Sequence, residues 1–434
     1  MKRSIYKDLL DWKIKRDRQP LLVRGARQVG KTFIINEFGK NEFESLVTLN
    51  FERNPEYKEI FTKYSPIEIL EKIALYTGKN IIENETLLFF DEIQECPKAI
   101  TSLRYFYEEM PNLHVIGAGS LLEFALESAN FRMPVGRVEY LFMYPLSFGE
   151  FLIALSEKPL LDFISEKVNF IKLTDLLHEK LIEYIRKYFI IGGMPAVVKE
   201  YITSHNILNC QKKQKIIINT FQDDFAKYAR HSKFKYLKKV FNAVPVMIGN
   251  KFIYSKVDSS AKSRDIKSAL ELLETANIIY KVKRTSGAGL PLKADVNEKF
   301  FKVIFLDIGL MHAINDIYSE TIKEKDLTAI YKGSVAEQFA GQELIAYQQN
   351  FTKTQLYYWA KESKNSSAEL DYLIEKNEEI IPIEIKFGSS GKMRSMNMFL
   401  KKYKIQTGIK ISQAKFSDKN KIKSIPFYGI EILS

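Results

Sequence analysis

Residues 25–32 have the types and spacing that bind phosphate. They fit the pattern GxxxxGK[ST] at every position: Gly25, Ala26, Arg27, Gln28, Val29, Gly30, Lys31 and Thr32. In such a loop the glycines let backbone N–H groups surround phosphate oxygens, the lysine reaches the β- and γ-phosphates, and the hydroxyl ligates Mg²⁺. A chance match in a glycine-containing turn is the alternative. The motif predicts a site for ATP and Mg²⁺.

Two acids supply the second half of this chemistry. Residues 86–90 read as a buried strand, and Asp91 and Glu92 stand at its carboxyl end, the edge where parallel sheets bind ligands. We expect Asp91 to hold Mg²⁺ through water and Glu92 to act as the general base on the attacking water. A core strand that runs into an acidic turn is the alternative.

Further candidates for contact with the γ-phosphate lie farther along the chain. Ser120 follows another strand-like run, residues 113–116, and would either sense the phosphate or cap the next helix. Arg137 or Arg132 in a loop would act as an arginine finger, on its own chain or on a neighbouring subunit of a homo-oligomer. An exposed loop arginine without a special role is the alternative.

The C-terminal part carries acids where a metal-dependent nuclease needs them. Glu337 opens a helix, Asp371 lies in a strand, and Glu384 and Lys386 lie in the next strand. Because side chains alternate along a strand, Glu384 and Lys386 share one face while the neighbouring isoleucines enter the core. Asp371 and Glu384 would share a divalent cation, and Lys386 would stabilise the attacking water or the developing charge. The alternative is ordinary alternation in a half-exposed strand.

The first section, residues 1–155, must position the phosphate loop. Strand-like runs alternate with helical stretches there, which predicts a parallel sheet covered by helices. The strand candidates are residues 21–23, 45–49, 87–90 and 114–116, and a helix should begin near Lys31.

Two sections follow with different patterns. Residues 156–235 carry apolar stripes at helical spacing and are expected to form a helical lid over the nucleotide. In residues 236–320, an amphipathic helix at 263–274 precedes strand-like segments at 278–282 and 302–306, as in a winged helix. The helix starts with basic residues that would contact DNA: Lys262, Arg264 and Lys267. Packing between domains is the alternative role.

Composition limits the class of protein. The chain has 434 residues, 46% of them hydrophobic, which favours several globular domains. Its net charge is 65 − 53 = +12, so DNA is a plausible partner, with a lysine-rich solvated face as the alternative. Only Cys96 and Cys210 occur, and no run suits a membrane helix. We expect a cytoplasmic protein without a disulfide framework or a cysteine zinc site.

Several segments together resemble a known family, the archaeal and bacterial AAA-type ATPases that carry a C-terminal domain of unknown function. The similarity spans most of the chain and includes residues 24–32, 89–94, 119–120, 135–137, 144–148, 192–195, 305–310 and 384–386. It implies a P-loop AAA-type α/β core with a helical lid, then a winged helix and a restriction-endonuclease-like α/β domain in residues 321–434. In that endonuclease superfamily, metal-dependent phosphodiester cleavage would fall to Glu337, Asp371, Glu384 and Lys386. The lid has no clear second sensor arginine.

Two functions remain open from the sequence. In the first, a Mg²⁺-dependent ATPase couples its nucleotide state to a DNA-directed C-terminal region, and real nuclease activity of the C-terminal acids is a second version of this function. In the second, the protein is a nucleotide-switched binding or signalling scaffold whose nuclease-like domain is inert. Metal-dependent cleavage that disappears on Asp371→Asn would separate the two.

Overall fold

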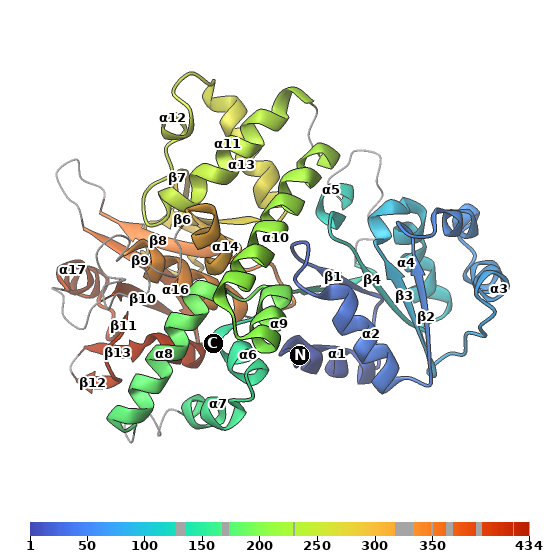
Figure 1. Cartoon of the computed structure of the whole chain (residues 1–434), viewed down its shortest axis with the longest axis horizontal. Helices are drawn as coiled ribbons and strands as arrows, with labels where there is room; N and C mark the ends of the chain where they lie inside the picture. Colours follow the sequence, from blue (N-terminus) through green and yellow to red (C-terminus); the bar gives the residue numbers. More distant parts are fainter. Residues whose placement is uncertain are drawn as a thin grey trace. The chain divides into compact units, whose positions relative to one another are not determined.

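The computed structural model describes most of the chain. It covers residues 1–126, 136–166, 173–228, 231–316, 333–348, 350–361, 368–387, 393–419 and 421–433. These residues form two compact units (Figure 1). The N-terminal unit is Lys2–Tyr144 with Gln349–Lys353, and the C-terminal unit is Pro145–Gln348 with Thr354–Ser434. None of the helices in the described ranges is both long and apolar enough to cross a membrane.

A parallel sheet forms the centre of the N-terminal unit. Its strands, as far as the structure describes them, are β1 (Leu21–Arg24), β2 (Ser45–Asn50), β3 (Thr86–Asp91), β4 (His114–Ala118) and β5 (Glu139–Phe142), in the order β2-β3-β4-β1-β5. The accompanying helices are α1 (Ile5–Ile14), α2 (Lys31–Glu42), α3 (Pro66–Thr77), α4 (Pro97–Glu109) and α5 (Leu122–Leu126). This is the P-loop ATPase arrangement, and the strands expected at 21–23, 45–49, 87–90 and 114–116 are confirmed.

The side chains of β3 point alternately to the two faces of this sheet, and all of them are buried. Leu88 and Phe90 join the apolar cluster that contains residues of α3 and α4. On α2, a Cβ at Gly39 would meet side-chain atoms of Leu46 and Leu87, so this helix packs directly on β2 and β3. Because both faces are covered by helices, β3 is apolar from Leu87 to Phe90 and ends in the polar Asp91.

A mixed sheet forms the centre of the C-terminal unit. Its described strands are β6 (Ile279–Thr285), β7 (Val296–Phe305), β8 (Leu356–Ala360), β9 (Glu369–Lys376), β10 (Glu379–Lys386), β11 (Gly408–Ser412), β12 (Ser417–Lys419) and β13 (Ile422–Pro426). The order is β12-β13-β11-β10-β9-β8-β6-β7. Strands β6 and β7, which the sequence suggested as the ribbon of a winged helix, therefore belong to the same sheet as the strands of the last section. The domain boundaries inside this unit stay a prediction.

The helices of the C-terminal unit begin beyond β5. They are α6 (Phe148–Ala154), α7 (Lys158–Ser165), α8 (Asp175–Ile191), α9 (Pro195–Ser204), α10 (Ile207–Tyr228), α11 (His231–Met247), α12 (Tyr254–Val257), α13 (Ser263–Thr275), α14 (Ile308–Ile314), α16 (Ser334–Ala346) and α17 (Arg394–Tyr403). The helical character expected for residues 156–235 is confirmed for the part of that range that the structure describes, and the helix expected at 263–274 is confirmed.

Helix α16 is the buried centre of the C-terminal unit. It contacts β7, β10 and α14, and its polar side chains satisfy backbone groups around it. Gln338 donates to the Phe305 carbonyl oxygen and accepts from the Phe305 N–H, at 2.7 and 2.8 Å. The Glu343 carboxylate accepts from the Phe148 N–H at 2.9 Å. Helix α16 therefore fixes the ends of β7 and α6, because buried backbone groups need such partners.

Candidate functional site

The backbone of residues 25–32 has the conformation that a phosphate nest needs. Gly25, Gln28 and Gly30 have φ angles of 140°, 66° and 99°. A Cβ at Gly25 would lie 2.1 Å from the Met143 carbonyl oxygen, so crowding as well as conformation requires glycine there. Helix α2 begins at Lys31, and its N–H groups and positive end point toward the loop. The loop fits the phosphates of a nucleotide.

The Lys31 ammonium is held at this loop by main-chain oxygens. It donates to the carbonyl oxygens of Gly25 and Ala26 at 2.9 and 2.8 Å, and the residue is only 7% exposed. Burial lowers its pKa to about 8, against the opposing charges of Glu92 and Asp91. A desolvated ammonium with neutral partners gains strongly from an anion, which is the chemistry required of a phosphate-binding lysine.

Asp91 joins the loop to the end of the sheet. It accepts at Oδ1 from the Thr32 hydroxyl at 2.9 Å and at Oδ2 from the Asn50 amide at 2.8 Å. Burial raises the pKa of this carboxyl, and the two hydrogen bonds oppose the rise. A carboxylate beside a hydroxyl is an oxygen donor set that suits Mg²⁺. Asn50 was missed by sequence reasoning, although it pairs with Asp91 in the register of β2 and β3.

Glu92 and Ser120 lie together, as their positions at neighbouring strand ends suggest. One carboxylate oxygen of Glu92, Oε2, accepts from the Ser120 N–H and hydroxyl at 3.0 and 3.1 Å, and from the Gln94 amide at 2.7 Å. Glu92 has a φ of 50°, a left-handed conformation that turns its side chain at the strand end. Ser120 therefore orients Glu92, a contact that neither alternative for this serine anticipated.

Of the two candidate arginine fingers, Arg137 has an ion-pair partner outside this group. Arg137 pairs with Glu108, Nε to Oε1 at 2.9 Å, and its side chain is 41% exposed. Glu108 also pairs with Arg104 at 3.0 Å. Arg132 lies outside the described residues. The arginine finger stays a prediction.

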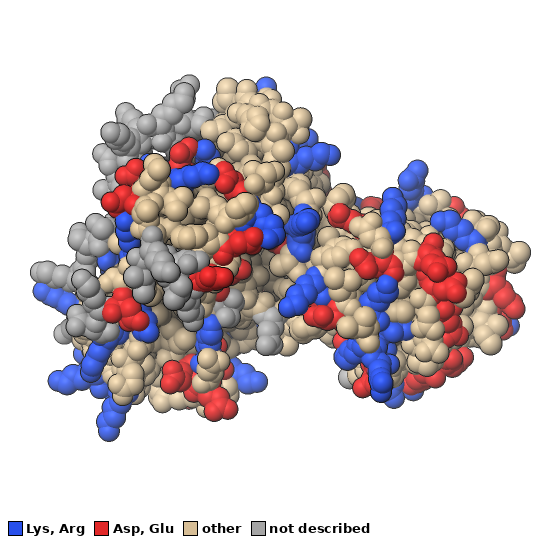
Figure 2. Space-filling view, turned by 90° about the horizontal axis from the view of Figure 1, so that it is seen from below, with Lys and Arg blue, Asp and Glu red and all other residues tan. Residues whose placement is uncertain are grey.

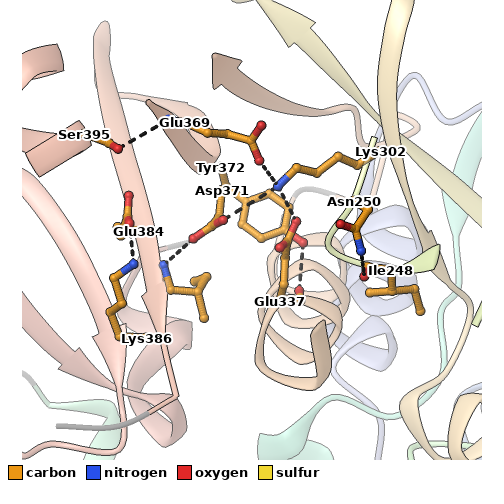
Figure 3. Close-up of polar contacts among 11 residues, drawn as sticks. Ile248, Asn250, Lys302, Glu337, Glu369, Asp371, Tyr372, Glu384, Lys386 and Ser395 are labelled. Carbon is orange, nitrogen blue, oxygen red and sulfur yellow. Dashed lines mark hydrogen bonds and ion pairs between the residues drawn. The ribbon is translucent and has the colours of Figure 1, made fainter. Parts of the chain in front are cut away.

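The C-terminal acids form one cluster between β9, β10 and α16 (Figure 3). Asp371 accepts at Oδ2 from the Ile385 N–H at 2.7 Å, which ties β9 to β10. Lys386 donates to Glu384 Oε1 at 2.6 Å, so the two side chains share a face, and Ile383 and Ile385 are buried as expected. Burial raises the pKa of Glu384.

Sequence reasoning missed the residue at the centre of this cluster. Lys302 of β7 is 1% exposed, and its ammonium lies 2.8 Å from Glu337 Oε1, 2.6 Å from Glu369 Oε1 and 3.7 Å from Asp371 Oδ1. Burial alone would lower its pKa, but these carboxylates raise it well above the ordinary value. A lone lysine in the apolar run of residues 301–306 was the available signal. Within the described ranges, no group of three or more His, Cys, Asp or Glu is arranged to hold a metal ion.

The basic residues proposed for DNA contact lie at the start of α13. Arg264 and Lys267 have side chains 78% and 61% exposed, and they lie 3.8 and 3.7 Å from Asp265 and Glu271. On the face shown in Figure 2, Lys and Arg side chains are interspersed with Asp and Glu. The exposed basic residues of α13 therefore have acidic neighbours.

Sequence comparison assigns a domain to each part. Residues 17–152 match the model of an AAA domain, and two domains of unknown function, DUF8612 and DUF4143, match residues 182–321 and 332–428. No curated protein matches the chain.

Comparison with solved structures gives low similarity over most of the chain. The Walker-type ATPase PABY2304 of Pyrococcus abyssi is 14% identical, with a TM-score of 0.44 over 71% of this chain and 94% of that chain. The Aeropyrum pernix ORC1 protein, solved in complex with DNA, is 12% identical, with a TM-score of 0.29 over 72% and 90%. The match to the AAA domain, together with the P-loop geometry, identifies the N-terminal part of this chain as an AAA-type ATPase domain. Two domains of unknown function follow it.

Proposed function

We propose that Lys31, Thr32, Asp91 and Glu92 carry Mg²⁺-dependent ATP hydrolysis in the N-terminal unit. The observation that carries the proposal is the hydrogen bond from Thr32 to Asp91 directly beside the buried Lys31. Thr32 and Asp91 would hold Mg²⁺, directly and through water, and the metal would neutralise charge on the β- and γ-phosphates. Glu92 would take the proton of the attacking water, and Ser120 would orient Glu92.

Two variants separate binding from chemistry. Lys31→Ala removes the ammonium and should lose ATP binding, whereas Glu92→Gln should keep binding and hydrolyse about 10²–10⁴-fold more slowly. The measurements are calorimetric ATP titration and phosphate release. Lys40→Ala, an exposed lysine on the same helix, is the matched control and should behave like the wild type. Equal loss of binding in both test variants would refute the assignment.

We further propose that the nucleotide state controls a C-terminal unit that binds DNA. The net charge of +12 and the exposed basic residues at the start of α13 support an electrostatic contact. DNA affinity should then fall with salt, with a log–log slope of about −0.9 per phosphate neutralised. Replacing Lys262, Arg264 and Lys267 by Ala should weaken binding and flatten the slope. A salt-independent affinity would contradict the proposal, and unchanged affinity in the triple variant would move the contact elsewhere.

Metal-dependent cleavage by Glu337, Asp371, Glu384 and Lys386 is the second candidate. Their proximity in one cluster supports it, but the position of Lys302 favours the scaffold with an inert nuclease-like domain. Cleavage of linear, supercoiled or branched DNA with Mg²⁺ or Mn²⁺ that is lost in Asp371→Asn would establish the nuclease.

A further inference from the structure

The acid cluster of the C-terminal unit already contains a cation. Four carboxylates contribute to it, those of Glu337, Glu369, Asp371 and Glu384, and three of them lie within 4 Å of the Lys302 ammonium at 2.8, 2.6 and 3.7 Å. Figure 3 shows the tip of Lys302 pointing into the space between Glu337, Glu369 and Asp371. A divalent ion shared by these acids would need the same space, because its oxygen ligands lie about 2.0–2.6 Å away.

The surroundings hold the ammonium at that point. Lys302 belongs to β7, where its neighbours Phe301 and Val303 are buried, so the strand fixes the root of the side chain. The Tyr358 ring lies 5.4 Å from its Nζ. The turn at Gly249 packs against one of these acids, because a Cβ there would lie 3.2 Å from Glu337 Oε2. The strand and the Tyr358 ring therefore hold the lysine, and the turn holds Glu337 beside it.

The acids still outnumber their cations. Glu384 is 7% exposed, and its Oε2 atom is buried without a hydrogen-bond partner among the described residues, while its Oε1 atom accepts from Lys386. Lys302 and Lys386 oppose four acids, of which Glu337 and Glu384 are buried while Glu369 and Asp371 are partly exposed, so acids remain in surplus. Phosphate would be repelled by this surplus, but a cation placed there would gain an oxygen ligand that is already desolvated.

We propose that Lys302 is the resident cation of this cluster, that it excludes divalent metal from the native chain, and that its removal opens a divalent-cation site among the acids that surround its ammonium, Glu337, Glu369 and Asp371, and, beside them, the Glu384 oxygen that has no hydrogen-bond partner in the described structure. Lys302 and the acids come from segments matched by different family models, residues 182–321 and 332–428. One segment thus neutralises the acids of the other. The proposal does not depend on ATP hydrolysis by the N-terminal unit.

Mn²⁺ binding to the whole chain without nucleotide tests both halves of the proposal. The background carries Asp91→Asn, so that the metal ligand proposed beside Thr32 is gone, and bound Mn²⁺ is measured by electron paramagnetic resonance. The background chain should bind no Mn²⁺ at about 1 mM, the weak end of carboxylate cation sites. Adding Lys302→Ala should create one site, at least about tenfold tighter than that limit. Lys302→Arg, which keeps the charge, should create none.

The remaining outcomes decide against the proposal. Mn²⁺ bound by the background chain and lost on Asp371→Asn would show that metal enters beside Lys302. A folded Lys302→Ala chain without a new site, or with one that survives Asp371→Asn, would exclude the latent site. If Lys302→Ala does not fold, Lys302→Ala with Glu384→Gln takes its place, because it leaves one acid fewer uncompensated and keeps the three acids that surround the ammonium. In every case, Mn²⁺ binding by the background chain decides whether Lys302 excludes divalent metal.

Discussion

The two units each bury a lysine beside carboxylates, and the two lysines have opposite chemistry. Lys31 donates to the main-chain oxygens of Gly25 and Ala26, and burial lowers its pKa to about 8. Lys302 donates to the side chains of Glu337 and Glu369, and its pKa rises well above the ordinary value. A buried lysine with neutral partners is prepared for an incoming anion. A buried lysine with carboxylate partners is a counter-ion and leaves no charge for a ligand.

The same substitution at both lysines should therefore have very different effects on stability. Lys302→Met leaves buried carboxylates without their cation and should lower the free energy of unfolding of the C-terminal unit by about 3–5 kcal/mol. Lys31→Met removes a desolvated charge and two hydrogen bonds to neutral oxygens, and should change the N-terminal unit by about 1 kcal/mol or less.

Each unit contains one of the two tryptophans, which makes the measurement specific. Trp12 is buried in the N-terminal unit and Trp359 in the C-terminal unit. Urea unfolding followed by fluorescence in a Trp12→Phe background reports on the C-terminal unit. The same measurement in a Trp359→Phe background reports on the N-terminal unit. Adding Glu337→Gln to Lys302→Met should restore part of the lost free energy of unfolding. Equal destabilisation by the two methionine substitutions would contradict the contrast between the lysines.

A smaller effect for each unit of pH follows from a buried acid that has no ammonium beside it in the described structure. Burial raises the pKa of Glu343 to about 8, and its bond from the Phe148 N–H opposes the rise. The folded pKa lies above the unfolded value, so its stabilising contribution is complete below about pH 4.5 and is lost as pH rises through about 8. The C-terminal unit should lose up to about 1.4 kcal/mol per pH unit from this group within that window.

The test is urea unfolding of the Trp12→Phe chain between pH 5 and pH 9. Glu343→Gln cannot ionise and should reduce the slope. Two further acids of this unit act in the same direction and leave a residual slope: burial raises the pKa of Asp307 to about 6, and burial raises the pKa of Glu337 to about 7 against the charge of Lys302. The prediction fails if the Gln variant keeps the full slope between pH 6 and pH 8.

Sequence was informative where chemistry and local structure share a short segment. The phosphate loop, the acids after β3 and the alternation in β10 could be placed because a run of apolar residues fixes the strand and its end. Lys302 could not be placed in this way. Its partners lie on α16 and β9, and the pairing depends on how β7 joins the sheet, which no periodicity encodes. Asn50 was missed for the same reason, since it acts across strands.

The smallest expected change in stability concerns Arg137, whose pairing with Glu108 is exposed. Such pairs contribute about 0–1 kcal/mol, so Arg137→Ala should leave the N-terminal unit almost as stable as before. If Arg137 acts on the nucleotide of a neighbouring subunit, its loss should lower ATP hydrolysis without lowering ATP binding. Mixing the inactive Arg137→Ala and Lys31→Ala chains should then recover some activity, because mixed interfaces can contain one intact site.

Glu108→Ala separates a finger from a simple ion pair. It removes the partner of Arg137 but keeps the guanidinium, whose charge is then available for phosphate. A finger predicts low hydrolysis in Arg137→Ala and normal or higher hydrolysis in Glu108→Ala. A purely structural pair predicts the same small effect in both variants, because each breaks the same contact. If mixtures that are shown to assemble together recover no ATPase activity, Arg137 does not act on the nucleotide of a neighbouring subunit. Its guanidinium then acts within its own chain or has no role in hydrolysis.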